Sequence, residues 1–196
     1  MTYQVGVTGG IGSGKTLVCN VLEKLGIPVY RADIEARRLM EEDSELVGQI
    51  VELFGEEAYI GGALNRSYLA GRVFGDGEQL RGLNGVVHPA VRRDYHRWLD
   101  QQSGAPYVVE EAAILFESGA SRFMDLVVMV YAPEALRIKR VMIRDGVGEE
   151  AVKKRMEHQM DEEEKRSKAD LVIINDENSR LLPRILDVHQ QILKRI

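Results

Sequence analysis

The sequence contains a single cysteine, Cys19, and no apolar run long enough to span a bilayer. One cysteine cannot form an intrachain disulfide, which excludes the class of small secreted domains held together by disulfides. Because a membrane helix needs roughly 20 consecutive apolar residues, we also expect no membrane partner. The N-terminus lacks the basic start, apolar stretch and small-residue cleavage site of a signal peptide, so we expect a cytoplasmic protein.

The sequence also lacks a basic face. Its 26 Lys and Arg residues are outnumbered by 31 Asp and Glu residues, which gives a formal net charge of −5. Proteins that hold nucleic acid through its phosphates carry clustered basic residues, so we expect no nucleic-acid partner. A local basic pocket for a small anion stays open. The sequence does not fix the oligomeric state; we expect a monomer and leave an oligomer open.

Five short segments rich in β-branched residues have the pattern of buried parallel strands, and helical patterning separates them. This alternation predicts an α/β fold with a five-stranded parallel sheet flanked by helices. The predicted strands are Tyr3–Val7, Ile27–Tyr30, Tyr107–Val109 (or on to Glu111), Leu126–Tyr131 and Leu171–Ile174, and the predicted helices include Lys15–Leu25, Pro133–Arg144 and Ser179–Ile192.

Two segments interrupt this alternation and divide the predicted core into residues 1–32, 105–144 and 169–196. Residues 33–104 carry helical patterning and no strand-like run, which predicts a helical insertion at the edge of the core. Within it, Gly61-Gly62 is predicted to form a turn before a helix that starts near Asn65.

The second interruption, residues 145–168, is dominated by charged residues. Its larger apolar residues, Val152, Met156 and Met160, recur every four positions and form a narrow stripe. A helix pair with such a stripe suits a lid hinged near Gly146 and Gly148. A solvated peripheral helical hairpin fits the pattern equally well.

Residues Gly9 to Thr16 match the pattern G-x-x-x-x-G-K-[ST] between the first predicted strand and a predicted helix. Glycines let the backbone curl round an oxyanion with its N–H groups pointing inward, and the helix N-terminus adds the positive end of its dipole. Lys15 adds a charge at the β- and γ-phosphates, while the Thr16 hydroxyl can ligate Mg²⁺. We therefore predict a P-loop NTPase fold that binds ATP and Mg²⁺ through Gly9, Gly10, Gly12, Ser13, Gly14, Lys15, Thr16 and Leu17.

Motifs outside residues 9–16 limit which class of nucleotide-dependent reaction the chain can catalyse. A GTPase would carry a guanine-reading Asn-Lys-x-Asp segment, which is missing here. The short chain, the insertion after the second strand and the charged segment 145–168 indicate a kinase of small metabolites.

Asp33 follows the second predicted strand. The carboxyl ends of strands in open α/β sheets face the ligand crevice, so this carboxylate could take the proton of an attacking hydroxyl. Asp33 is also a good N-cap for a helix over Ile34–Met40. Both interpretations stay open.

Other candidate groups carry weaker signals. Arg137, Arg140 and Arg144 share one predicted helical face, which suits either phosphate binding or a solvated face paired with acids. Glu111, at the end of the third predicted strand, could serve Mg²⁺, although a surface acid is the default interpretation. His88 would ordinarily be a structural residue.

The ordered set of motifs resembles the dephospho-coenzyme A kinase family along nearly the whole chain. The stretch from Thr8 to Thr16 is similar to the phosphate loop of that family, and residues 31–37 are similar to its Ala-Asp-x-x-Ala-Arg segment. The His-Pro at 88–89, the Leu-Phe-Glu at 115–117 and the Ala-Asp at 169–170 follow in the same order.

The resemblance implies transfer of the ATP γ-phosphoryl group to the ribose 3′-hydroxyl of dephospho-CoA, the last step of coenzyme A biosynthesis. It implies that Asp33 is the base, that residues 33–104 form the helical domain that binds the acceptor substrate, and that residues 145–168 are the lid. The roles it implies for other residues are Lys15 and Arg140 in catalysis, Arg140 and Asn175 at the nucleotide, Arg37, His88 and Glu117 at the acceptor, and Thr16 with Glu111 at Mg²⁺.

The chain departs from the family pattern at several positions. Ala113 stands where the family usually has Pro, Arg137 where Gln is frequent, and Glu111 where Asp is common. Two alternatives to this family stay open: another P-loop small-molecule kinase, such as a nucleoside monophosphate kinase, and a nucleotide-gated binding module without transfer activity.

Overall fold

The computed structural model describes residues 2–178 and 180–196. Contacts between Cα atoms divide the chain into two compact units. The first unit runs through Arg31 and resumes at Gln101, and the second comprises Ala32–Asp100. Each unit is described by itself.

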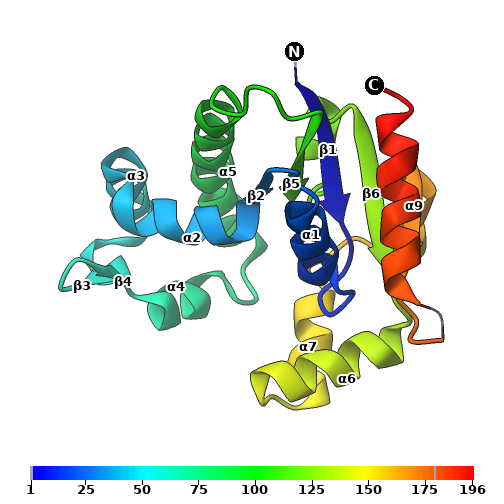
Figure 1. The fold of residues 1–196 in the computed structure, drawn as a ribbon. Helices are drawn as coiled ribbons and strands as arrows, with labels where there is room; N and C mark the ends of the chain where they lie inside the picture. Colours follow the sequence, from blue (N-terminus) through cyan, green and yellow to red (C-terminus); the bar gives the residue numbers. More distant parts are fainter. Residues whose placement is uncertain (1, 179) are drawn as a thin grey trace. The chain divides into compact units, whose positions relative to one another are not determined.

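The first unit is built on a parallel five-stranded sheet with strand order β2-β5-β1-β6-β7 (Figure 1). The central strand β1 pairs with β5 on one side and with β6 on the other. This confirms the predicted α/β fold with a five-stranded parallel sheet flanked by helices. The strands are β1 (Tyr3–Thr8), β2 (Val29–Arg31), β5 (Tyr107–Glu111), β6 (Leu126–Tyr131) and β7 (Leu171–Ile174).

Burial on both faces of the sheet explains the apolar runs of its strands. Every residue of β5 is buried, as are the first five residues of β6. Two helices, α1 (Lys15–Lys24) and α9 (Leu181–Leu193), pack against each other and contribute to the same core. The core includes Val5, Val18, Val109, Val128, Ile173, Ile185 and Ile192.

The predicted ends of these elements needed small corrections. Strand β2 begins at Val29 rather than Ile27, and proline, which has no N–H to donate, stands just before it at Pro28. Helix α9 begins at Leu181, whereas the predicted helix started at Ser179, which lies outside the described residues.

The chain between β6 and β7, which includes the charged residues 145–168, forms helices. They are α6 (Glu134–Asp145), α7 (Glu149–Met156) and α8 (Glu162–Lys168), and a short 3-10 helix, η2 (Ala120–Phe123), precedes β6. Val152 of α7 is fully buried against Ile138 and Val141 of α6, so the predicted apolar stripe is what attaches α7 to the body.

The second unit consists mainly of helices around a core of its own. Leu39, Leu46, Ile50 and Phe54 are central members of this core. Asn65, predicted to start a helix, does so, because its side chain accepts a hydrogen bond from the Tyr68 N–H. The helices are α2 (Ala32–Glu42), α3 (Ser44–Phe54), η1 (Glu56–Ala58), α4 (Arg66–Val73) and α5 (Gly77–Leu99).

The prediction that this insertion contains no strand is wrong. A small antiparallel hairpin joins β3 (Tyr59–Ile60) to β4 (Ala63–Leu64) through Gly61-Gly62. Both glycines have positive φ, 60° and 84°, as a two-residue hairpin turn requires. Strands of two residues are too short to show alternation in the sequence.

Across the described ranges, no helix combines the length and the apolar composition needed to cross a membrane. Even α5, with 23 residues, carries acidic and basic side chains along its length.

We expect that Ile50→Ala lowers the free energy of unfolding by about 2–5 kcal/mol, because it leaves a cavity in the core of the second unit. Ile60→Ala is the matched control, since Ile50 is 0% exposed and Ile60 is 68% exposed. Urea denaturation followed by circular dichroism measures both. Equal losses in the two variants would contradict the proposed core.

Candidate functional site

The glycine-rich loop between β1 and α1 has the backbone geometry of a phosphate cradle. Gly9, Gly12 and Gly14 have φ of 144°, 81° and 99°, a region that other residues rarely adopt. A Cβ at Gly9 would collide with the backbone carbonyl of Val130 in β6. The loop therefore depends on glycine both for its conformation and for its close approach to the sheet.

Lys15 is buried and lies over this loop. Its Nζ donates to the carbonyl of Gly9 at 2.8 Å and lies 3.4 Å from the carbonyl of Gly10. The loop is closed by a hydrogen bond from the Ser13 N–H to the same Gly10 carbonyl at 3.1 Å. A fixed positive charge and a curled run of N–H groups thus occur together, which is the arrangement that binds phosphate.

Thr16 and Glu111 form a pair of oxygen-bearing side chains beside the loop. The Thr16 hydroxyl donates to Glu111 Oε1 at 2.9 Å. Glu111 Oε2 is buried without a hydrogen-bond partner among the described residues, and it lies 3.6 Å from Arg31 Nε. Within those residues, no three His, Cys, Asp or Glu side chains gather into a metal cluster.

Cys19 lies one turn further along α1 and is fully buried. Burial, with the nearby Glu111 carboxylate, raises the pKa of the Cys19 thiol well above its ordinary value. The thiolate is therefore disfavoured, which argues against Cys19 as a nucleophile.

Arg140 and Asn175, both predicted at the nucleotide, meet the phosphate loop from α6 and from the end of β7. Arg140 Nη2 donates to the Asn175 carbonyl at 3.2 Å, and Nη1 donates to the Gly12 carbonyl at 3.4 Å. The Asn175 side-chain amide donates to the Ser13 carbonyl at 2.8 Å. These two side chains therefore brace the back of the loop.

The three arginines predicted on one face of α6 have different environments. Arg144 is exposed and pairs with Asp145 at 2.7 Å, so the interpretation of a solvated, paired side chain holds for it. Arg137 is buried, donates from Nε to the Ala132 carbonyl at 3.2 Å and lies 3.8 Å from Glu162 Oε1.

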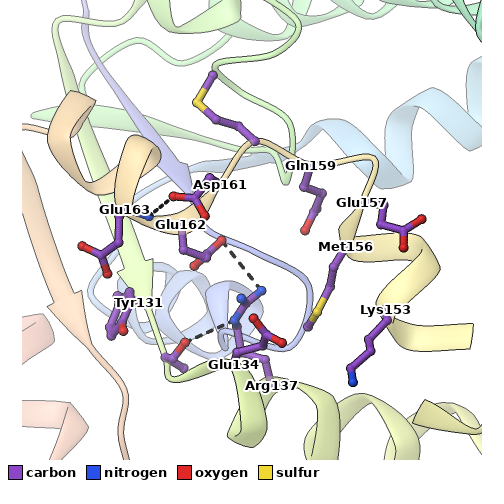
Figure 2. Close-up of a pocket in the computed structure, with 12 residues that line it drawn as sticks. Tyr131, Glu134, Arg137, Lys153, Met156, Glu157, Gln159, Asp161, Glu162 and Glu163 are labelled. Atoms are coloured by element: carbon purple, nitrogen blue, oxygen red, sulfur yellow. Dashed lines mark hydrogen bonds and ion pairs between the residues drawn. The ribbon is translucent and has the colours of Figure 1, made fainter. Parts of the chain in front are cut away.

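The residues just before α8 and at its start contact the glycine-rich loop, and the sequence did not predict these contacts. Gln159 Oε1 accepts a hydrogen bond from the Ile11 N–H at 2.9 Å. Gln159 and Glu162 line a cavity of about 550 Å³ together with Arg137, as Figure 2 shows.

Glu117, predicted to contact the acceptor, has partners within its own unit. Lys165 of α8 is 0% exposed, and its Nζ lies 2.9 Å from Glu117 Oε1 and 3.0 Å from the Ala113 carbonyl. The Met160 N–H donates to Glu117 Oε1 at 2.7 Å. Glu117 therefore fastens the 145–168 segment to the body of the first unit.

The remaining candidates include Asp33, Arg37 and His88, which belong to the second unit. Asp33 and Arg37 are exposed on α2, and His88 is half-buried within α5, where burial lowers its pKa. The interpretation of Asp33 as an N-cap is wrong, because α2 already begins at Ala32 and Asp33 lies inside its first turn. Leu17, in the first unit, has an exposed side chain on α1.

Comparison with known proteins settles the family. The model of the dephospho-CoA kinase family matches residues 3–180. The chain belongs to this family. A dephospho-CoA kinase from Bacteroides fragilis is 39% identical over 188 residues, covering 96% of this chain and 92% of the relative. One from Salinibacter ruber is 47% identical over 175 residues, covering 88% of each.

Solved structures agree with this assignment to the dephospho-CoA kinases. A crystal structure of a Thermus thermophilus protein has a TM-score of 0.86 at 38% identity, covering 100% of this chain and 98% of the other. Dephospho-CoA kinase from Campylobacter jejuni has a TM-score of 0.70 at 30% identity, covering 99% and 98%. Shikimate kinase from Bacteroides thetaiotaomicron, at 15% identity and a TM-score of 0.53, shares the fold alone.

We expect Gly9→Ala to lower the free energy of unfolding by roughly 2–6 kcal/mol, since it combines backbone strain with a collision at the Val130 carbonyl. Gly26→Ala is the control, because Gly26 also has positive φ, 84°, but a Cβ there meets open space. It should lose only about 1–2 kcal/mol. Guanidinium denaturation compares the two, and similar losses would contradict the tight approach of the loop to β6.

Proposed function

We propose that this chain is a dephospho-CoA kinase that transfers the γ-phosphoryl group of ATP to the ribose 3′-hydroxyl of dephospho-CoA, in the cytoplasm and with Mg²⁺. The observation that carries the proposal is the phosphate loop with Lys15 bound across its Gly9 carbonyl, in a chain of this family. An alcohol as acceptor requires a base, and a transferred phosphoryl group requires charge stabilisation.

The loop amides and Lys15 would bind the β- and γ-phosphates, since both place positive charge at one point. Arg140 and Asn175 support this by holding the loop carbonyls of Gly12 and Ser13 from behind. In that position the Arg140 guanidinium would also add positive charge near the nucleotide. Its present partner Glu177, at 3.2 Å, is exposed and easily displaced.

Thr16 and Glu111 fit a magnesium ion. Both offer oxygen, the ligand that Mg²⁺ prefers, and Glu111 Oε2 is a buried oxygen with no hydrogen-bond partner in the described part of the chain. Mg²⁺ usually keeps several waters and takes few protein ligands, so two side chains suffice. When bound, the ion would neutralise charge on the phosphate oxygens.

Asp33 is the proposed base on the acceptor hydroxyl. It follows Arg31, the last residue of β2, by two positions, so covalent geometry keeps the two Cα atoms within about 7 Å. Arg31 Nε is 3.6 Å from Glu111 Oε2, which ties this end of β2 to the proposed magnesium site. The carboxylate would take the hydroxyl proton as the oxygen bonds to the γ-phosphorus and the bond to ADP breaks.

The acceptor would be bound by the helical second unit, with Arg37 and His88 among the contacts, and Glu117 would contribute from the first unit. The 145–168 segment would act as a lid that keeps water from the transferred group. Its buried link between Lys165 and Glu117 supports a docked form of α8. A nucleoside monophosphate kinase is not favoured, given the family and the exposed carboxylate at Asp33.

The direct test is ADP release with dephospho-CoA as acceptor, compared with nucleoside monophosphates. We expect turnover with dephospho-CoA and only background with the others. Product analysis should place the new phosphate on the ribose 3′-oxygen. Background rates with dephospho-CoA would refute the assignment.

We expect Asp33→Asn to lower turnover by about 100-fold or more while ATP affinity stays within a few fold, because a positioned base acts on the chemical step. Glu35→Gln, two residues further along α2, is the control and should keep near-normal turnover. Stopped assays at saturating substrates measure both variants. Near-normal turnover of Asp33→Asn would remove the base from the proposal.

Lys15→Ala should weaken ATP binding and slow turnover together, because the ammonium contacts the phosphates in both the ground state and the transition state. Lys24→Ala, at the exposed end of α1, should change neither. Calorimetric titration with ATP gives the affinity. Unchanged affinity and turnover in Lys15→Ala would refute the placement of the triphosphate.

A further inference from the structure

Arg137 and Glu162 form a buried ion pair against the outer side of the phosphate loop. Their side chains are only 6% and 14% exposed, and Arg137 Nη1 lies 3.8 Å from Glu162 Oε1 (Figure 2). A Cβ at Gly10 would meet both Arg137 Nη1 and Glu162 Oε1, so both charged heads rest on this glycine. The reaction proposed above assigns neither residue a role.

Gly10 connects this pair to the proposed catalytic lysine. Its carbonyl lies 3.4 Å from Lys15 Nζ, while Arg137 Nη1 and Glu162 Oε1 lie where a side chain at this position would begin. The next residue, Ile11, donates its N–H to Gln159, three positions before Glu162. The segment between α7 and α8 therefore contacts two consecutive residues of the phosphate loop.

This arrangement is poorly explained by stability alone. Glu162 Oε2 is buried without a hydrogen-bond partner among the residues described, and burial raises the pKa of this carboxyl despite the cations around it. A buried ion pair with an unsatisfied oxygen is often no more stable than packed apolar residues. A role in holding α8 at a fixed distance from α6 and the loop explains this buried ion pair better than a role in stability does.

We propose that Arg137 and Glu162 are a positioning pair for phosphoryl transfer, which holds the α7–α8 segment against Gly10 and thereby aligns the loop and Lys15 on the terminal phosphate. The inference deepens the proposed function by adding two residues to its machinery. Because the pair joins α6 to the start of α8 beside Gly10, the α7–α8 segment closes and the loop is aligned at the same time. Water is therefore excluded from the site only when the loop and Lys15 bind the terminal phosphate of ATP.

The experiment compares Arg137→Gln, Glu162→Gln and the double variant. Glu163→Gln is the matched control, since the neighbouring Glu163 also lines the cavity but its side chain is 68% exposed. Three quantities are measured for each: the turnover of transfer to dephospho-CoA, ATP hydrolysis without acceptor, and the melting temperature. Glu162→Asp, which keeps the charge on a shorter side chain, is included as the conservative variant.

We expect both single variants to lower transfer by roughly 10-fold to 100-fold, the scale of small misplacements of reacting groups. The ratio of acceptor-free hydrolysis to transfer should rise by at least about 10-fold for the same reason. The double variant leaves no unpaired buried charge, so its melting temperature should recover towards wild type while its ratio stays high. Glu162→Asp should fall between Glu162→Gln and wild type, and Glu163→Gln should match wild type.

A merely structural pair would give a different result. Melting temperatures would fall in the single variants and recover in the double variant, while the hydrolysis-to-transfer ratio stayed at the wild-type value throughout; that result overturns the inference. Should wild type not phosphorylate dephospho-CoA, the proposed function fails separately. In that case the rate of ATP hydrolysis without acceptor tests the positioning role of Arg137 and Glu162. A rate in Glu162→Gln equal to that of wild type overturns the inference.

Discussion

The close approach of Gly9 to the Val130 carbonyl fixes the position of the glycine-rich loop within the first unit. Only a residue without a side chain allows the loop to leave β1 this near to β6. That approach places the Gly9 carbonyl under Lys15 Nζ and brings the loop within reach of Arg140 and Asn175. Because the loop leaves the central strand of the sheet, its curled backbone is held in one place.

Around this loop, acidic side chains repeatedly serve as fasteners within the first unit. Glu111 accepts from Thr16, Glu117 pairs with Lys165, and Glu162 lies against Arg137. Each joins elements distant in sequence, so the site is held by a few charged contacts between otherwise separate helices and strands. Charged contacts of this kind fix geometry more reliably than they add stability.

The sequence alone was sufficient for the sheet, the glycine-rich loop between β1 and α1 and the helical content after β6, because these depend on local patterns such as apolar runs and glycine spacing. It did not show that α7 packs against α6. It was insufficient for the β3–β4 hairpin, whose strands are too short to alternate, and for the start of α2 at Ala32. It also missed the partners of Arg137 and Glu117, since a partner 25 or 43 positions away leaves no local trace. The motifs predicted the glycine-rich loop, whereas the contacts that hold this loop in place are seen only in the three-dimensional structure.

The complete burial of Lys165 makes this side chain a natural reporter. An amine-reactive reagent can acylate its Nζ only after α8 has separated from Glu117 and from the Ala113 carbonyl. The reactivity of that single nitrogen would therefore measure how often the helix detaches, in the way that hydrogen exchange measures local opening of a backbone. Lys165, which attaches α8 to the body of the first unit, would thus report by its reactivity how often α8 detaches.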